Sequence, residues 1–84
     1  MNVLFTSQGR EDYLCWQQTN KNTLKRINLL IKECMKEQFS GLGKPEALKF
    51  EMAGWWSRRI DSEHRLVYRI DNSNVIIVQC RYSY

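Results

Sequence analysis

The side chains best suited to chemistry in this sequence of 84 residues are arginines. A guanidinium holds phosphate well because its planar fork donates two parallel hydrogen bonds and it keeps its charge. Arg59, Arg65 and Arg81 are therefore candidates to position a phosphodiester and to stabilise charge on its oxygens as it reacts. The alternative is that these arginines only form structural ion pairs with nearby acidic residues.

One carboxylate lies among cations near the middle of the chain. Glu46 follows the loop Ser40-Gly41-Leu42-Gly43-Lys44-Pro45 and lies between Lys44 and Lys49. A carboxylate in such surroundings stays ionised near neutral pH, so it can accept a proton but does not readily supply one. Glu46 is thus a candidate general base, and Lys44 and Lys49 are candidate phosphate ligands, although most loop glutamates only aid solubility.

Two further side chains could take part in the reaction. His64 is the only histidine, and its imidazole titrates closest to neutral pH. Its place at a turn-to-strand junction, between Glu63 and Arg65, fits either proton transfer or a positioning role. Tyr84 could stack on a base or bond a phosphate, unless it belongs to a frayed terminus.

The pattern does not fit a metal or cofactor site. Cys15, Cys34 and Cys80 are widely spaced, and no CxxC pair, Cys/His cluster, glycine-rich phosphate loop or Ser-His-Asp arrangement occurs. We expect reduced thiols in a cytoplasmic protein, with no metal and no cofactor. RNA transesterification suits such a site because the substrate supplies its own nucleophile, the ribose 2′-hydroxyl, and the protein needs only a base, an acid and cations.

Length and composition indicate one globular domain spanning residues 1–84. The net charge of +4 is mild, and it fits either an ordinary basic surface or a polyanionic partner. The N-terminus lacks the pattern of a signal peptide, and no apolar run approaches the length that spans a membrane. We therefore expect no membrane association.

The N-terminal half predicts a strand over residues 1–5, a helix ending near residue 18 and a longer helix ending near residue 37. Thr6 or Ser7 can cap the first helix, and Thr19 or Asn20 the second. The second helix has the three-and-four spacing of a buried face. Its apolar positions are Leu24, Ile27, Leu30, Ile31, Cys34 and Met35.

Beyond the loop at residues 40–45, the pattern predicts four strands joined by tight turns, at roughly residues 46–50, 55–60, 64–70 and 75–82. Tight turns imply antiparallel hairpins. The expected fold is α+β, with two N-terminal helices packed on a twisted, mostly antiparallel sheet.

The period of two assigns faces to these strands. In the strand predicted at residues 64–70, one face carries Leu66, Tyr68 and Ile70, and the other carries Arg65, Val67 and Arg69. In the strand predicted at residues 75–82, one face carries Ile76, Val78, Cys80 and Tyr82, and the other carries Ile77, Gln79, Arg81 and the following Ser83. One face is then apolar and suits the helices. The other gathers Arg65, Arg69 and Arg81, together with either Arg59 and Trp55 or Arg58 and Trp56. A sheet face carrying arginines and aromatic rings suits phosphates and unstacked bases.

Five segments in the same order resemble the YoeB-type toxins of the RelE superfamily. They are Tyr13-Leu14-x-Trp16-Gln17, Gly41-x-Gly43-Lys44-Pro45-Glu46-x-Leu48-Lys49, Gly54-x-Trp56-Ser57-Arg58-Arg59-Ile60, Glu63-His64-Arg65-Leu66-Val67-Tyr68 and Cys80-Arg81-Tyr82. The resemblance covers essentially the whole chain. It implies a ribosome-dependent mRNA endonuclease of a type II toxin–antitoxin pair, which cuts the codon in the A site of the 70S ribosome.

The resemblance also implies roles and partners. Glu46 matches the family's general base, Arg65 the residue that stabilises the scissile phosphate, and Lys49, Arg59 and Tyr84 further residues of the site. A YefM-like antitoxin is the implied inhibitor, and a homodimer is the implied state of the toxin. The implied fold, a pair of N-terminal helices on a twisted antiparallel sheet, agrees with the one expected above.

One position departs from the family. Ser83 stands where the family usually has a histidine that is thought to act as general acid. An alcohol is far too weak an acid to replace an imidazolium, so three explanations compete. Tyr84, Lys49 or His64 donates the proton; a ribosomal group or water does; or the chain is attenuated. The rival functions are a non-cleaving inhibitor that occupies the A site and a ParE-like inhibitor of DNA gyrase.

Overall fold

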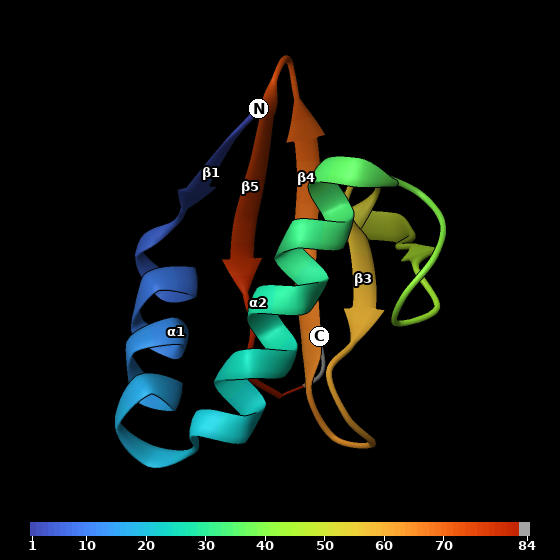
Figure 1. Ribbon diagram of the computed structural model, residues 1–84. Coiled ribbons are helices and arrows are strands. Elements are labelled where there is room, and N and C mark those ends of the chain that lie inside the picture. The colour runs from blue at the N-terminus through green and yellow to red at the C-terminus, as the bar shows by residue number, and fades with distance from the viewer. Residues whose placement is uncertain (83–84) are drawn as a thin grey trace.

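The computed structural model describes residues 1–82, which form two helices on one face of a five-stranded sheet (Figure 1). In chain order the elements are β1 (Asn2–Phe5), α1 (Ser7–Thr19), α2 (Lys21–Lys36), β2 (Glu46–Ala47), the 3-10 turn η1 (Phe50–Met52), β3 (Trp56–Arg59), β4 (Arg65–Asp71) and β5 (Asn74–Gln79). The strands lie in the order β1-β5-β4-β3-β2, and only the β1–β5 pair is parallel. The expected α+β fold is thereby confirmed.

Both helices begin at the predicted caps. The Thr6 hydroxyl accepts a hydrogen bond from the backbone N–H of Gly9 at 3.1 Å, and the Asn20 side chain accepts one from Thr23 at 3.1 Å. Gly9 weakens the helical pattern of α1, and the structure gives the reason for it. A Cβ at this position would lie 2.5 Å from the carbonyl oxygen of Ile77, so the glycine lets α1 approach β5 closely.

The core lies between the helices and the sheet. The predicted stripe of α2 supplies Ile27, Leu30, Ile31 and Cys34, whereas Met35 is 37% exposed and lies outside the core. From the sheet side the core receives Ile60, Leu66, Tyr68, Val75, Ile77 and Cys80. No helix within residues 1–82 has the length and apolar character needed to cross a membrane.

The first and the last of the four strands predicted beyond residue 45 are shorter than expected. The strand predicted over residues 46–50 consists of Glu46 and Ala47 alone, because the chain leaves the sheet and enters η1 with Phe50 in the left-handed region at φ 57°. The last strand ends at Gln79 instead of Tyr82, and Tyr82 is also left-handed, at φ 62°. A left-handed residue turns the chain and ends the pleat.

A bulge changes the assignment of faces in β5. The register of β4 with β5 shifts between Val67, which pairs with Gln79, and Tyr68, which pairs with Ile77. The extra residue breaks the period of two. Cys80 therefore lies in the core with Ile77, and its predicted grouping with Ile76 and Val78 is wrong.

Arg58 is fully buried on the side of the sheet that the helices cover. The opposite side, here called the open face, therefore carries Arg59 and Trp55, and the alternative pair of Arg58 and Trp56 is wrong. The Arg58 guanidinium donates to the Tyr68 hydroxyl at 3.2 Å and to the carbonyl oxygens of Leu42 at 2.7 Å and Ser40 at 3.0 Å, and it also bonds the Glu37 carbonyl. These carbonyls follow the end of α2, where the helix leaves acceptors without partners. The buried charge thus fixes the loop that leads to Glu46.

Candidate functional site

The face of the sheet turned away from the helices brings one carboxylate and one guanidinium together. Glu46 from β2 and Arg65 from β4 reach across β3, and the Arg65 Nη1 lies 3.3 Å from the Glu46 Oε1. Beneath them the buried Ser57 of β3 places its hydroxyl 3.5 Å from the same nitrogen. The sequence left Ser57 without a role, because a serine in a strand has no signal that distinguishes it from a solvated one.

The two partners differ in exposure, and this difference bears on what each can do. The Arg65 side chain is 22% exposed, whereas that of Glu46 is 56% exposed. Arg65 is therefore held by protein contacts while it still presents donors to a ligand, and Glu46 remains accessible to a reacting proton. Electrostatic stabilisation depends on such fixed donors because they need no reorganisation as charge develops.

Cations from neighbouring segments extend this site. Arg59 is the register partner of Arg65, so both side chains lie on the same face of the sheet, and Arg59 is exposed. Lys44 lines a groove together with Arg59, and Lys49 lines an open depression together with Glu46. Arg59 thus lies on the same face as Arg65, whereas Lys44 and Lys49 line two separate depressions, of which only the second includes the predicted base, Glu46.

The remaining predicted residues lie elsewhere or outside the described part. Arg81 lines a depression beside α1 with Asp12 and Cys15, and its guanidinium packs over the Tyr82 ring at 4.8 Å. It does not join Arg65 on the open face, because β5 has ended and the chain has turned. Ser83 and Tyr84 lie outside the described residues.

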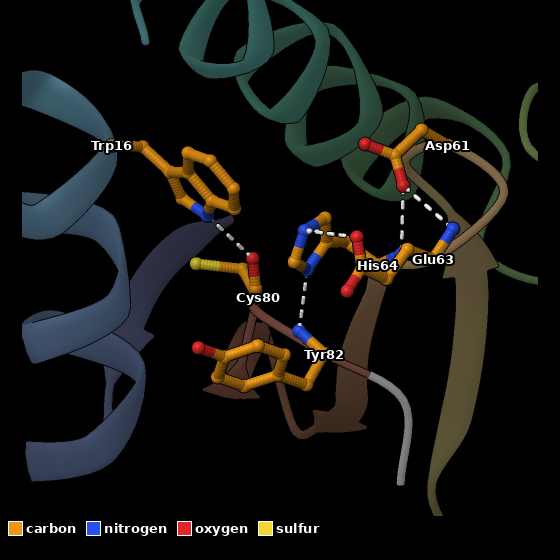
Figure 2. A network of polar contacts seen from close by, with 6 residues as sticks. All are labelled: Trp16, Asp61, Glu63, His64, Cys80 and Tyr82. Carbon is orange, nitrogen blue, oxygen red and sulfur yellow. Dashed lines mark hydrogen bonds and ion pairs between the residues drawn. The ribbon is translucent and has the colours of Figure 1, made fainter. Parts of the chain in front are cut away.

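His64 is buried and engaged at both ring nitrogens (Figure 2). Its Nδ1 accepts a hydrogen bond from the backbone N–H of Tyr82 at 2.7 Å, and its Nε2 lies 3.5 Å from a Glu63 carboxylate oxygen. The rings of His64 and Trp16 pack edge to face, with centroids 4.9 Å apart and planes at 82°. An acceptor at Nδ1 requires the proton of the neutral ring to reside on Nε2. This geometry supports the positioning alternative for His64 over proton transfer.

Asp61 organises the turn that precedes His64. Its Oδ1 accepts the backbone N–H groups of Glu63 at 2.8 Å and His64 at 2.7 Å. Partial burial acts to raise the pKa of Asp61, but these two hydrogen bonds and the neighbouring imidazole hold it below its ordinary value. The Asp-Ser-Glu sequence predicts a turn, but not that the carboxylate supports a residue of the site.

The thiols do not form a reactive centre. All three cysteines are free. Burial raises the pKa of Cys34 to about 11 and that of Cys80 to about 12, so both stay protonated at neutral pH. Among residues 1–82, no group of three or more His, Cys, Asp or Glu side chains is arranged to hold a metal ion.

Known proteins resemble this chain over its whole length. A family profile described as a YoeB-like toxin of bacterial type II toxin–antitoxin systems matches residues 5–84. The chain is 52% identical to Toxin YoeB of Synechocystis sp. over 84 residues, which are all of this chain and 98% of the relative. The structure of a YoeB/ParE toxin from Agrobacterium tumefaciens matches at a TM-score of 0.98 and 45% identity over the whole of both chains. A YoeB dimer and a YoeB–YefM complex, both from Staphylococcus aureus, each match at a TM-score of 0.93, with 44% and 45% identity over all of this chain and 98% of theirs.

Proposed function

The chain belongs to the YoeB family of toxins of bacterial type II toxin–antitoxin systems, and on that premise we propose that it is an endoribonuclease that cleaves mRNA in the ribosomal A site. The observation that carries the proposal is the contact between Glu46 and Arg65 at 3.3 Å on the open face of the sheet. RNA transesterification needs a proton acceptor, donors that bind the phosphate and an acid for the leaving oxygen, and this contact would supply the first two.

In the proposed mechanism, the Glu46 carboxylate takes the proton of the ribose 2′-hydroxyl. The 2′-oxygen then attacks the phosphorus, the bond from phosphorus to the 5′-oxygen breaks, and the products are a 2′,3′-cyclic phosphate and a 5′-hydroxyl. Arg65 donates to the phosphate oxygens as negative charge develops on them. Arg59, Lys44 and Lys49 hold the neighbouring phosphates, and no metal or cofactor takes part.

The leaving 5′-oxygen must receive a proton, and Ser83 is the residue at the position of the family's acid. In this chain water or a ribosomal group would supply that proton. Because an alcohol cannot match an imidazolium as an acid, we propose that this chain cleaves more slowly than one with histidine there. General acid catalysis is worth on the order of 10²–10⁴-fold. The variant Ser83→His should therefore raise the single-turnover rate, and an unchanged or lower rate would mean that another group supplies the proton.

The partners follow from the family and its relatives. A YefM-like antitoxin would neutralise the toxin, since the S. aureus relative forms a complex with YefM. A homodimer is the proposed free state, since that relative also forms a dimer. The ribosome and its mRNA would be the target, which places the site of action in the cytoplasm.

The test compares cleavage of mRNA on programmed ribosomes by the wild-type chain and by Glu46→Gln. Loss of the base should slow single-turnover cleavage on the order of 10²–10⁴-fold. Glu11→Gln is the matched control, because Glu11 is exposed on α1 and lies outside the site. Wild-type-like cleavage by Glu46→Gln would remove Glu46 from the mechanism.

Because Ser83 replaces the family's acid, a second function is worth testing: a toxin that occupies the A site without cutting the mRNA. Ribosomes stalled by such a protein would carry intact mRNA. A supercoiling assay with DNA gyrase, run beside the cleavage assay, separates both from a ParE-like inhibitor.

A further inference from the structure

The segment that follows β5 is held at several points by distant parts of the chain. The Trp16 Nε1 donates to the carbonyl of Cys80 at 2.8 Å, and the Asp12 carboxylate accepts the Cys80 N–H at 3.1 Å. Two residues further on, the Tyr82 N–H donates to the His64 Nδ1 at 2.7 Å (Figure 2). The Tyr82 carbonyl accepts the N–H of Arg65 at 3.0 Å. Residues 80–82 are thus tied to α1 and to the start of β4.

The backbone of Tyr82 is strained. Its φ of 62° lies in the left-handed region, which a bulky side chain rarely adopts. Burial of the ring does not explain the conformation, because Tyr82 is 53% exposed. Such strain persists where the surroundings over-determine it and often accompanies function. Here the bonds to His64 and Arg65 satisfy both the N–H and the carbonyl of Tyr82.

The imidazole of His64 is itself fixed from several sides. Trp16 packs its ring against the imidazole, Glu63 lies beside the Nε2, and the backbone N–H of His64 is bonded to Asp61. Within residues 1–82, the His64 Nδ1 is the acceptor that the Tyr82 N–H reaches, at 2.7 Å. The acceptor is therefore rigid, and a rigid acceptor selects one backbone conformation for the residue that it binds.

We propose that His64 is a positioning residue of the ribonuclease site: its unprotonated Nδ1 locks Tyr82 in the left-handed conformation beside Arg65. This inference rests on the proposed function for its catalytic consequence. Arg65 follows His64 directly, and the same Tyr82 backbone binds both residues. The hydrogen bond from Tyr82 to His64 therefore helps to set the start of the strand that carries Arg65. His64 does not transfer a proton to the substrate.

Two variants separate the acceptor from the bulk of the ring. In His64→Asn the amide oxygen takes nearly the place of Nδ1, so the bond to Tyr82 is kept. In His64→Leu the volume is similar but the acceptor is gone. Glu63→Gln is the control, since the amide keeps an acceptor oxygen beside Nε2, removes only the exposed charge and leaves Nδ1 unaltered. All three are measured for thermal unfolding, for amide hydrogen exchange of Tyr82 and for the rate and half-saturation of single-turnover cleavage on programmed ribosomes.

We expect His64→Leu to accelerate exchange of the Tyr82 amide and to lower the maximal cleavage rate on the order of 10–100-fold, with half-saturation unchanged. His64→Asn and Glu63→Gln should keep both properties close to wild type. Wild-type protection of the Tyr82 amide in a folded His64→Leu would overturn the proposal, as would an Asn variant that behaves like the Leu variant.

One measurement needs no variant. The ¹⁵N chemical shifts of the imidazole in the wild-type protein distinguish a bare ring nitrogen from a protonated one, and we expect Nδ1 to be bare and Nε2 to carry the proton. A protonated Nδ1 in the neutral ring would refute the lock even if His64→Leu fails to fold. Hydrogen exchange and ¹⁵N shifts do not depend on catalysis. A chain that never cuts mRNA would therefore refute the proposed function without refuting the structural role of the bond between Tyr82 and His64.

Discussion

Replacing the buried Arg58 with methionine should destabilise the domain more than any loss of a surface charge. Arg58 is fully buried, and its guanidinium is bonded to the Tyr68 hydroxyl and to three carbonyls of the segment after α2. A hydrogen bond to a charged group contributes about 1.5–3 kcal/mol. Four such bonds do not add in full, because water reaches the freed loop carbonyls and methionine restores part of the packing.

A buried acceptor left without its donor costs about 1–3 kcal/mol, so with water reaching part of the loop we expect a net loss of about 3–5 kcal/mol. Domains have about 0.05–0.15 kcal/mol of stability per residue, so that loss is a large share of the total here. In a domain of this size each kcal/mol lowers Tm by about 4–8 °C, so we expect a fall of roughly 12–40 °C.

Denaturant unfolding of Arg58→Met beside Arg69→Met provides the assay. Arg69 is the matched control because its side chain is 44% exposed, lies 3.8 Å from Asp71 and packs over Trp55 at 5.0 Å. Its replacement should cost less than about 1 kcal/mol. Two variants that unfold within about 1 kcal/mol of each other would refute the view that Arg58 anchors the loop.

Three further predictions concern other parts of the fold. The pKa of Asp61 is held below its ordinary value in the folded protein, so the ionised carboxylate stabilises the fold above the ordinary pKa and loses this effect as the pH falls through the folded pKa. The difference in unfolding free energy between wild type and Asp61→Asn should therefore narrow from about pH 7 to about pH 2.5. A constant difference would contradict this. A thiol reagent at about pH 8 should react rapidly with Cys15 in the native protein and with Cys34 and Cys80 only in denaturant, because burial raises the pKa of the latter two. Rapid reaction of all three thiols in the native state would disprove this. Gly9→Ala should destabilise the protein by about 1–3 kcal/mol, because the new Cβ would meet the Ile77 carbonyl. This loss is expected although alanine is the better helix former. A more stable variant in the same unfolding assay would show that α1 can shift.

The parts of the fold that sequence could predict are those with a strong local signal. The stripe from Leu24 to Cys34 and the caps at Thr6 and Asn20 indicate the two helices, and both caps are present in the structure. The tight turns indicate the antiparallel hairpins. The bulge at Val67 and Tyr68 has no comparable signal, since it arises from pairing between strands, and it moved Cys80 to the core.

The residues of the candidate site could be predicted, but the residues that hold them in place could not. Glu46 and Arg65 could be named from charge and chemistry, and the structure places them in contact. The buried position of Arg58 and the contact of Ser57 with Arg65 depend on long-range packing, which a single sequence does not record. Arg81 was misplaced because the period of two does not continue beyond the end of β5.

The central claim, cleavage by attack of the 2′-hydroxyl in the ribosomal A site, is tested most directly by the ends of the mRNA fragments. Wild-type protein is mixed with ribosomes programmed with a defined codon in the A site, and the new termini are mapped and chemically identified. The mechanism predicts a cut within that codon, a 2′,3′-cyclic phosphate and a 5′-hydroxyl, and little product with Glu46→Gln. Intact mRNA on the stalled ribosomes, or fragments ending in a 3′-hydroxyl and a 5′-phosphate, would contradict it.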